Sequence, residues 1–256
     1  MSSPASEQYL KTIAKHAETK PNFHIIQTGN TSLLRTFFDS PLHFSPDCSY
    51  EIALTSLETY YSFPNIDAKN NIVKISLDKE ATWKTIKIPT GCYGLKAIDA
   101  EFQRQIIVNG GKKDDAKFEA NRNTFQCILT IKDNIAVNFE TENSLRSVLG
   151  FKAKKYRKGR YESEKIVNIM RVNSIMVHCD IIGSSYLNGI QQPIIYSFFP
   201  DVNPGNKIIS SPQTLIYLPV TLSIISQMTS WLTDQDEELL DLRGEELTLK
   251  FHIKAC

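Results

Sequence analysis

Residues 50–63 read YEIALTSLETYYSF, and this run of apolar, β-branched and aromatic side chains decides the class of the fold. Side chains of a strand alternate between the two faces of a sheet. Ile52 and Leu54 share one face of an extended chain, whereas Leu57 starts an apolar series on the other face. The stretch therefore predicts one long strand whose facing changes at a β-bulge near residues 55–56.

Further short stretches have the same β character and are separated by turn residues. They are residues 23–26, 33–38, 71–77, 85–88, 125–131, 135–139, 175–182, 193–199, 215–220, 224–232 and 247–253. Short strands at near-regular spacing are typical of a β-sandwich or a barrel. The turn Lys132-Asp133-Asn134 predicts a hairpin between the two strands that flank it.

Two helical segments interrupt the β pattern. Apolar side chains recur at three- and four-residue steps from Leu95 to Ile106, and the glycines at 110–111 end this internal helix. Residues 143–151 predict one capped helical turn that stops at Gly150. The sequence thus predicts an all-β fold with one internal helix carried in a loop.

The N-terminal segment predicts a short amphipathic helix. Ser3 can cap it, Pro4 suits its first turn, and Leu10 and Ile13 fall on one face. Such a helix is either an arm that docks on a neighbouring molecule or a helix packed on its own domain. No linker divides the remaining β pattern, so we predict a helical arm over residues 1–21. A single domain over the rest, residues 22–256, follows it.

Composition excludes several classes of protein. The 256 residues carry 29 Lys and Arg against 28 Asp and Glu, a net charge of +1, which argues against a dedicated nucleic-acid coat. No apolar run reaches the roughly 18 residues of a membrane span, and the N-terminus lacks the features of a secretory signal. The five cysteines are widely spaced and include no CxxC, which favours reduced, buried thiols. We therefore expect synthesis in the cytoplasm, with cytosol or nucleus as the compartment.

No catalytic, cofactor or metal site is predicted. In His178-Cys179-Asp180, neighbouring side chains of one strand point to opposite faces, so His178 and Cys179 cannot enter one pocket, and Cys179 is expected in the core. The other histidines are isolated in sequence, and no phosphate-binding loop or HExxH is present. The acidic run at 234–238 is expected to be a solvated turn, and the lysines that follow Gly111 lie at the wrong end of a helix for phosphate.

The sharpest charge feature is a run of six cations in nine residues. They are Lys152, Lys154, Lys155, Arg157, Lys158 and Arg160. The run predicts either a patch for packaged DNA or a nuclear-import signal, and a basic loop without a partner is the alternative.

The order of several short motifs resembles one family. The motifs are YEIAL at 50–54, FPNI at 63–66, IPTGCY at 88–93, LGF at 149–151, VHCDIIGSSYLNG at 177–189, FFPDVNPG at 198–205, YLPV at 217–220 and DLRGE at 241–245. In this order they resemble the minor capsid (penton) proteins of Polinton/Maverick elements and of adintovirus- or virophage-like viruses. The resemblance spans residues 22–254.

The resemblance implies a single jelly roll of eight strands in two facing sheets, with extra strands and a helix in its loops. It also implies a homopentamer at the fivefold vertices of an icosahedral capsid, beside trimers of a double-jelly-roll major capsid protein. On this reading the protein is a structural virion component of a virus or transposable element, without enzymatic activity or cofactor. Its partners are copies of itself, the major capsid protein and packaged DNA, and nuclear assembly is left open.

Two other interpretations stay open at this stage. A host genome can retain such a gene as a jelly-roll binding module with a role outside the capsid. A capsid-associated hydrolase would need converging polar residues in a cleft, and the sequence offers no such set.

Overall fold

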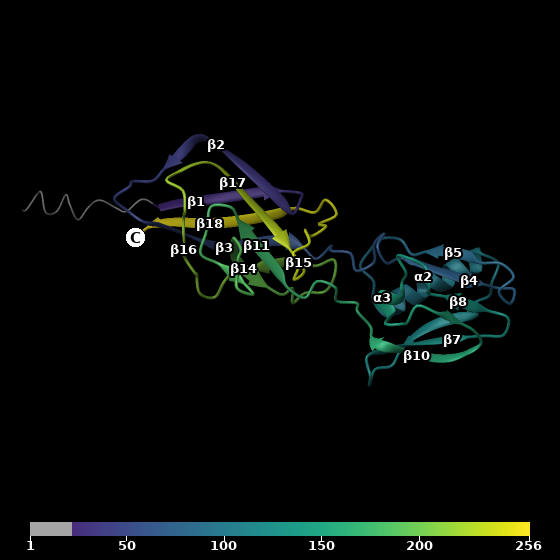
Figure 1. Ribbon diagram of the computed structural model, residues 1–256. Helices are drawn as coiled ribbons and strands as arrows, with labels where there is room; N and C mark the ends of the chain where they lie inside the picture. Colours follow the sequence, from purple (N-terminus) through teal and green to yellow (C-terminus); the bar gives the residue numbers. More distant parts are fainter. Residues whose placement is uncertain (1–21) are drawn as a thin grey trace, which may run out of the picture. The chain divides into compact units, whose positions relative to one another are not determined.

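The computed structural model describes residues 22–256, which form two units. Two separate segments, 22–61 and 174–256, build the first unit, and the residues between them, 62–173, build the second (Figure 1). The sequence predicts one domain over residues 22–256, and within these bounds the described chain forms two compact units. The inserted segment is itself rich in strands, so no change of pattern marks its limits. The predicted arm, residues 1–21, lies outside the described part of the chain.

The first unit is a jelly roll, as predicted. Its main strands are β1 (Asn22–Gly29), β2 (Leu33–His43), β3 (Tyr50–Tyr60), β11 (Ile175–Cys179), β14 (Ile194–Phe198), β15 (Lys207–Ser210), β16 (Leu218–Pro219), β17 (Ile224–Thr233) and β18 (Leu247–Ala255). One sheet has the order β1-β18-β3-β15, with β16 also paired to β3, and the other has the order β14-β11-β17-β2. A small hairpin of β12 (Tyr186–Leu187) and β13 (Ile190–Gln191) lies between β11 and β14. This interleaving of early and late strands in both sheets is the double Greek key of a jelly roll.

The bulge predicted in the long strand β3 is present. β3 pairs antiparallel with β18, and the register shifts between Lys250, opposite Ser56, and Phe251, opposite Leu54. Thr55 is therefore the extra residue, and its Oγ1 donates a 3.0 Å hydrogen bond to the carbonyl oxygen of Lys250. The bulge lets apolar side chains on both sides of it face the same core.

Strict alternation fills the core of the jelly roll from β18. Leu247, Leu249, Phe251 and Ile253 are at most 1% exposed, whereas the residues between them are half-buried on the outer face. Burial of four large apolar side chains from one strand agrees with the place of β18 as an inner strand of its sheet, between β1 and β3.

The second unit contains two sheets and two helices. Its elements are β4 (Ile72–Ser76), β5 (Lys84–Lys87), α2 (Leu95–Val108), β6 (Ala116–Ala120), β7 (Gln126–Ile131), β8 (Ala136–Asn138), α3 (Arg146–Leu149), β9 (Lys155–Tyr156) and β10 (Gly159–Ile166). The sheet orders are β5-β4-β8-β9 and β10-β7-β6. The predicted hairpin at 132–134 is wrong, because β7 pairs with β6 and β10 while β8 pairs with β4 and β9. The turn instead carries the chain from one sheet to the other.

Both helices of the second unit occur where the sequence predicts them. On α2 the apolar stripe of Ile98, Phe102 and Ile106 is fully buried in the core of this unit. The short helix α3 ends at Gly150, whose φ of 82° is the left-handed conformation that glycine adopts most readily. A Cβ there would lie 2.2 Å from the carbonyl oxygen of Lys165, so this position requires glycine. Among residues 22–256, no helix has the length and hydropathy to cross a membrane.

Candidate assembly surfaces

The two flanks of the jelly roll end in strands with a free edge. Within the described chain, β1 and β2 border the two sheets on one flank, and β14 and β15 border them on the other. An edge strand presents unpaired N–H and C=O groups, which proteins either protect or use for association. The flanks are therefore the surfaces on which we expect contacts with other molecules.

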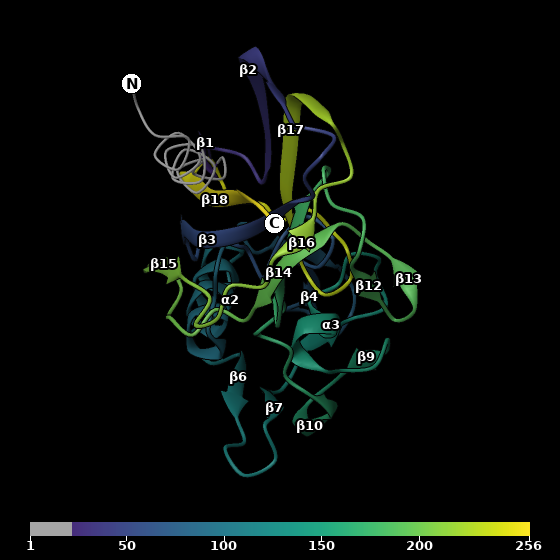
Figure 2. The same ribbon diagram turned by 90° about the vertical axis from the view of Figure 1, so that its left-hand side faces the viewer.

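The β2 flank carries apolar side chains on its outer face. Along this strand Leu34 is buried, while Leu33 and Phe37 point outward and are 40% and 70% exposed. Arg35 and Asp39, also exposed, lie on the same face on either side of Phe37. Figure 2 shows the ends of β2 and β17 standing clear of β1 and β18. Phe37 is therefore a projecting aromatic ring on an uncovered edge strand.

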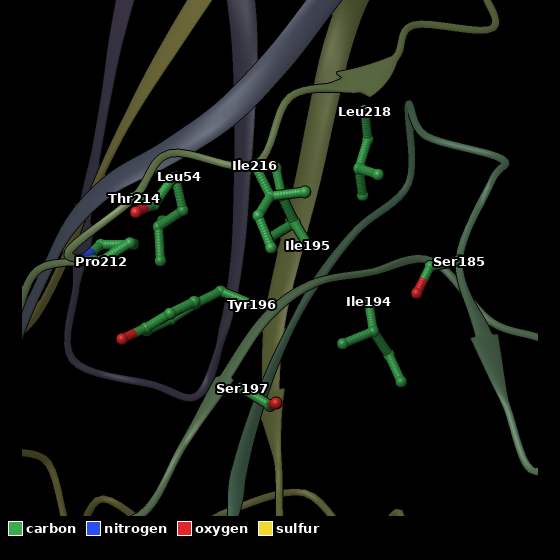
Figure 3. A pocket seen from close by; sticks show the side chains of 10 residues that line it. All are labelled: Leu54, Ser185, Ile194, Ile195, Tyr196, Ser197, Pro212, Thr214, Ile216 and Leu218. Carbon is green, nitrogen blue, oxygen red and sulfur yellow. The ribbon is translucent and has the colours of Figure 1, made fainter.

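The opposite flank contains a pocket that arises from a gap in the strand pairing of β3. β16 pairs with Glu51 and Ile52, whereas β15 pairs with residues 57–60, so neither strand covers the bulged stretch 53–56 on this edge. Leu54 lines the resulting cavity of about 310 Å³ (Figure 3).

The lining of this pocket is apolar with a few hydroxyl groups. It consists of Leu54, Ser185, Ile194, Ile195, Tyr196, Ser197, Pro212, Thr214, Ile216 and Leu218. The hydroxyls of Tyr196 and Ser210 lie 3.2 Å apart and join the edge strands β14 and β15. No charged side chain is among the lining residues. The chemistry of the pocket fits an apolar or aromatic group and offers nothing for an ionic ligand.

The outer face of the β1-β18-β3-β15 sheet brings together groups that are far apart in sequence. Glu58 on β3 accepts hydrogen bonds from Lys207 at 2.7 Å and from Lys250 at 3.1 Å, and these contacts lower its pKa. The rings of His24 and His252, which the sequence left isolated, stack with centroids 4.8 Å apart. Desolvation, His24 and the Lys254 ammonium lower the pKa of His252. The pairing of these histidines could have been predicted only from the register of β1 against β18, which places His24 opposite His252.

The predicted basic run lies in the second unit, where it covers the end of β9 and the start of β10. Lys155 lies on β9, Arg160 lies on β10, and the remaining cations occupy the connecting turns. Lys155 and Arg157 both contact the carboxylate of Glu80. The run is therefore held by strands and is not simply a loop.

Carboxylates neutralise part of this run. Lys154 lies 3.7 Å from Glu164, and Lys158 lies 2.7 Å from Asp133. Together with Glu80, three carboxylates thus face six cations, which leaves three positive charges. In the part of the chain that the structure describes, no ion pair includes Lys152 or Arg160, and both side chains are exposed.

His178 and Cys179 do not form a site. His178 is 3% exposed, its ring stacks on Trp231 with centroids 4.9 Å apart, and its Nε2 lies 2.9 Å from Oγ1 of Thr233. Burial lowers the pKa of His178 to about 4 and raises the pKa of the Cys179 thiol to about 12. A neutral imidazole and a protonated, fully buried thiol have the chemistry of packing residues.

The acidic run at 234–238 is a turn between β17 and β18. Oδ1 of Asp234 accepts hydrogen bonds from the backbone N–H groups of Asp236 at 2.9 Å and Glu238 at 3.0 Å. This carboxylate shapes the turn and is itself only 5% exposed, whereas residues 236–238 are exposed to solvent. Among residues 22–256, no group of three or more His, Cys, Asp or Glu is placed to hold a metal ion.

Comparisons with known proteins add a likeness of fold. No protein-family model matches the chain, and no curated protein matches its sequence. The crystal structure of the selenomethionine-labelled mavirus penton protein is similar over 93% of this chain and 100% of that chain, with a TM-score of 0.50 and 12% sequence identity. The D2–D3 domains of the flagellar cap protein FliD from Escherichia coli match over 84% of this chain and 100% of that one at 14% identity, but the TM-score of 0.20 carries no argument. The first likeness extends over both units of this chain and concerns the fold alone.

Proposed function

We propose that this protein is a penton-like minor capsid protein that forms homopentamers at the fivefold vertices of an icosahedral capsid. The observation that carries the proposal is a jelly roll whose two flanks end in uncovered strands, together with a fold likeness to a penton protein along nearly the whole chain. On this proposal the neighbours are a double-jelly-roll major capsid protein, as the sequence resemblance implies.

The geometry of the flanks favours a closed ring. In a cyclic assembly each subunit uses one surface toward the subunit ahead and a different surface toward the subunit behind. The two flanks of this protein are such a pair of different surfaces. The β1/β2 flank carries the exposed side chain of Phe37, and the β14/β15 flank contains the pocket beside Leu54. A net charge of +1 lets many copies pack without strong mutual repulsion.

The mass of the purified full-length protein in solution tests the proposal. Native mass spectrometry and negative-stain electron microscopy are expected to show a five-subunit ring. Co-expression with the major capsid protein of the same virus or element is expected to place the protein at capsid vertices. A monomer at every concentration, with no incorporation into capsids, would contradict the proposal and favour a binding module that uses the pocket for a small apolar ligand.

The basic run favours a second role, contact with packaged DNA. Lys152 and Arg160 are the two cations of the run that are exposed and outside the ion pairs of the described chain. A phosphate contact releases bound counterions, so each one adds close to one unit to the slope of log affinity against log salt.

A pair of double variants tests this role. Lys152→Gln with Arg160→Gln is expected to weaken binding to duplex DNA and to reduce the salt slope by about two. Lys155→Gln with Arg157→Gln is the matched control, because these two cations already face Glu80, and it is expected to change the slope less. Equal effects of the two double variants would contradict a specific role for Lys152 and Arg160, and no effect of either would leave the run as a surface feature.

A further inference from the structure

We infer that Phe37 of one copy inserts into the pocket beside Leu54 of the next copy, and that this contact closes the ring. The inference rests on the proposed pentamer and names the pair of surfaces that makes it. The two surfaces belong to the same unit of the chain. They lie at opposite ends of one sheet, because β2 and β14 are the two outer strands of the order β14-β11-β17-β2.

Position on opposite edges decides the kind of contact. Phe37 and the pocket of one molecule are separated by the two inner strands of the sheet, so a molecule cannot fill its own pocket with this ring. A protruding apolar side chain that fits a pocket elsewhere on an identical molecule generates a head-to-tail contact, and such contacts form a ring when the rotation closes. A second copy of this chain is therefore the occupant that the arrangement supports.

The size of the pocket fits the ring. A cavity of about 150 Å³ lined by apolar side chains is enough to bind benzene. The pocket here is about 310 Å³, so it has room for the phenyl ring of Phe37 and for atoms of the strand that carries it.

The chemistry of the two surfaces also agrees. The pocket is lined by apolar side chains and hydroxyls and by no charged group, and Phe37 is a 70% exposed ring without a polar atom. Arg35 and Asp39 flank the ring with one charge of each sign, and both can stay at the wet rim while the ring enters. An exposed aromatic anchor that fills a pocket is the kind of residue that dominates binding at interfaces.

Mass measurements on three single variants of the full-length protein provide the first test. Phe37→Asp removes the ring, Thr214→Trp fills the pocket from an exposed position in an irregular segment, and Val108→Asp is a control on an exposed apolar side chain away from both flanks, 70% exposed on α2 of the second unit. The first two are expected to raise the concentration at which the pentamer forms by about tenfold or more. The control is expected to change it less than about twofold.

Mixing the two defective copies gives the sharpest result. A copy with Phe37→Asp keeps its pocket, and a copy with Thr214→Trp keeps its ring, so the mixture has one intact pair of surfaces and is expected to stop at a one-to-one dimer. Disulfide trapping gives an independent readout in a background with the exposed Cys48 and Cys256 changed to serine. Asp39→Cys, next to Phe37 on the same face of β2, with Thr214→Cys keeps the ring and is expected to yield a ladder of linked subunits up to five.

The outcomes separate this inference from the proposed function. If Phe37→Asp still forms pentamers at the wild-type concentration, or if the mixture forms no dimer, the inference is overturned while the penton role stands. If Thr214→Cys instead links to cysteines placed in residues 1–21, the N-terminal segment occupies the pocket and the inference is again overturned. If the wild-type protein never forms a ring and never joins a capsid, the proposed function fails as well.

Discussion

Acid is expected to destabilise the jelly-roll unit through His178. Its side chain is 3% exposed and its pKa is lowered to about 4, whereas an exposed histidine titrates near ~6.5. Above about pH 6.5 the group is neutral in both states and contributes nothing to the pH dependence. As the pH falls from there toward 4, the unfolded chain binds a proton that the folded chain does not bind. The free energy of unfolding therefore drops by about 1.4 kcal/mol per pH unit, about 3 kcal/mol over the whole window.

Urea unfolding followed by fluorescence measures this loss. Trp231 stacks on His178, so a background with Trp83→Phe leaves it as the only tryptophan and makes it report on the first unit. His178→Phe keeps an aromatic ring against Trp231 but cannot titrate. It is expected to lose about 2–3 kcal/mol less stability than the parent between about pH 6.5 and pH 4.5.

A control and a refuting result complete the test. Met228→Leu, a conservative change at another buried position of the same sheet, is expected to keep the pH dependence of the parent protein. Carboxylates titrate mainly below the chosen window, so they do not mask the difference. If the parent and the His178→Phe variant lose stability in parallel over this window, the buried imidazole is not the source of the acid sensitivity.

Three further outcomes follow from the described contacts. Gly150→Ala is expected to destabilise the protein by several kcal/mol, and Gly205→Ala by only about 1 kcal/mol. Both glycines have positive φ, but only the first has a backbone atom within 3 Å of the new Cβ, so equal shifts in thermal unfolding would count against the clash. Cys48 is expected to react with a thiol reagent at once and Cys179 only after denaturation, since it is fully buried; rapid reaction of Cys179 in the native protein would contradict its placement. Residues 62–173, expressed alone, are expected to unfold cooperatively because they contain their own core, and a fragment without a melting transition would show that the core needs the rest of the chain.

Strand positions could be predicted wherever one face of a strand is buried. β18 alternates so strictly between buried and half-buried residues that period alone locates it. The bulge at Thr55 could also be predicted from the sequence, because one extra residue reverses the face of the sheet to which every following side chain points. In both places the spacing of apolar residues along one strand reflects which side chains are buried in the folded protein.

Partner choice could not be predicted in the same way. The turn at 132–134 has the residues of a hairpin, but β7 pairs with β6, the strand before it, and with β10, while β8 pairs with β4 and β9. β10 escaped notice because its middle reads Glu-Ser-Glu-Lys at 162–165 and has no apolar alternation, as befits an edge strand. These outcomes depend on packing between segments, which no window of sequence contains.

The candidate surfaces show the same division. The basic run was found from its composition, yet the pairing of two of its cations with Glu80 depends on a residue more than seventy positions earlier. The pocket draws its lining from β3, β14, β16, the segment before β16 and Ser185, so it exists only once those strands are paired. The outward position of Phe37 could not be predicted either, because an aromatic residue that points outward from an edge strand and one that points inward give the same sequence pattern.

The interruption of the jelly roll between β3 and β11 has a consequence for biosynthesis. β1 finds its partner β18 only after residues 247–255 have left the ribosome, whereas the inserted segment 62–173 is contiguous and complete much earlier. During translation, therefore, the insert folds while β1, β2 and β3 still lack most of their partner strands. Strands without partners expose apolar surface and free edges that promote aggregation until the two sheets are complete. Contacts between residues this distant along the chain form slowly. Chaperone dependence during synthesis is accordingly expected for residues 22–60 and not for the insert.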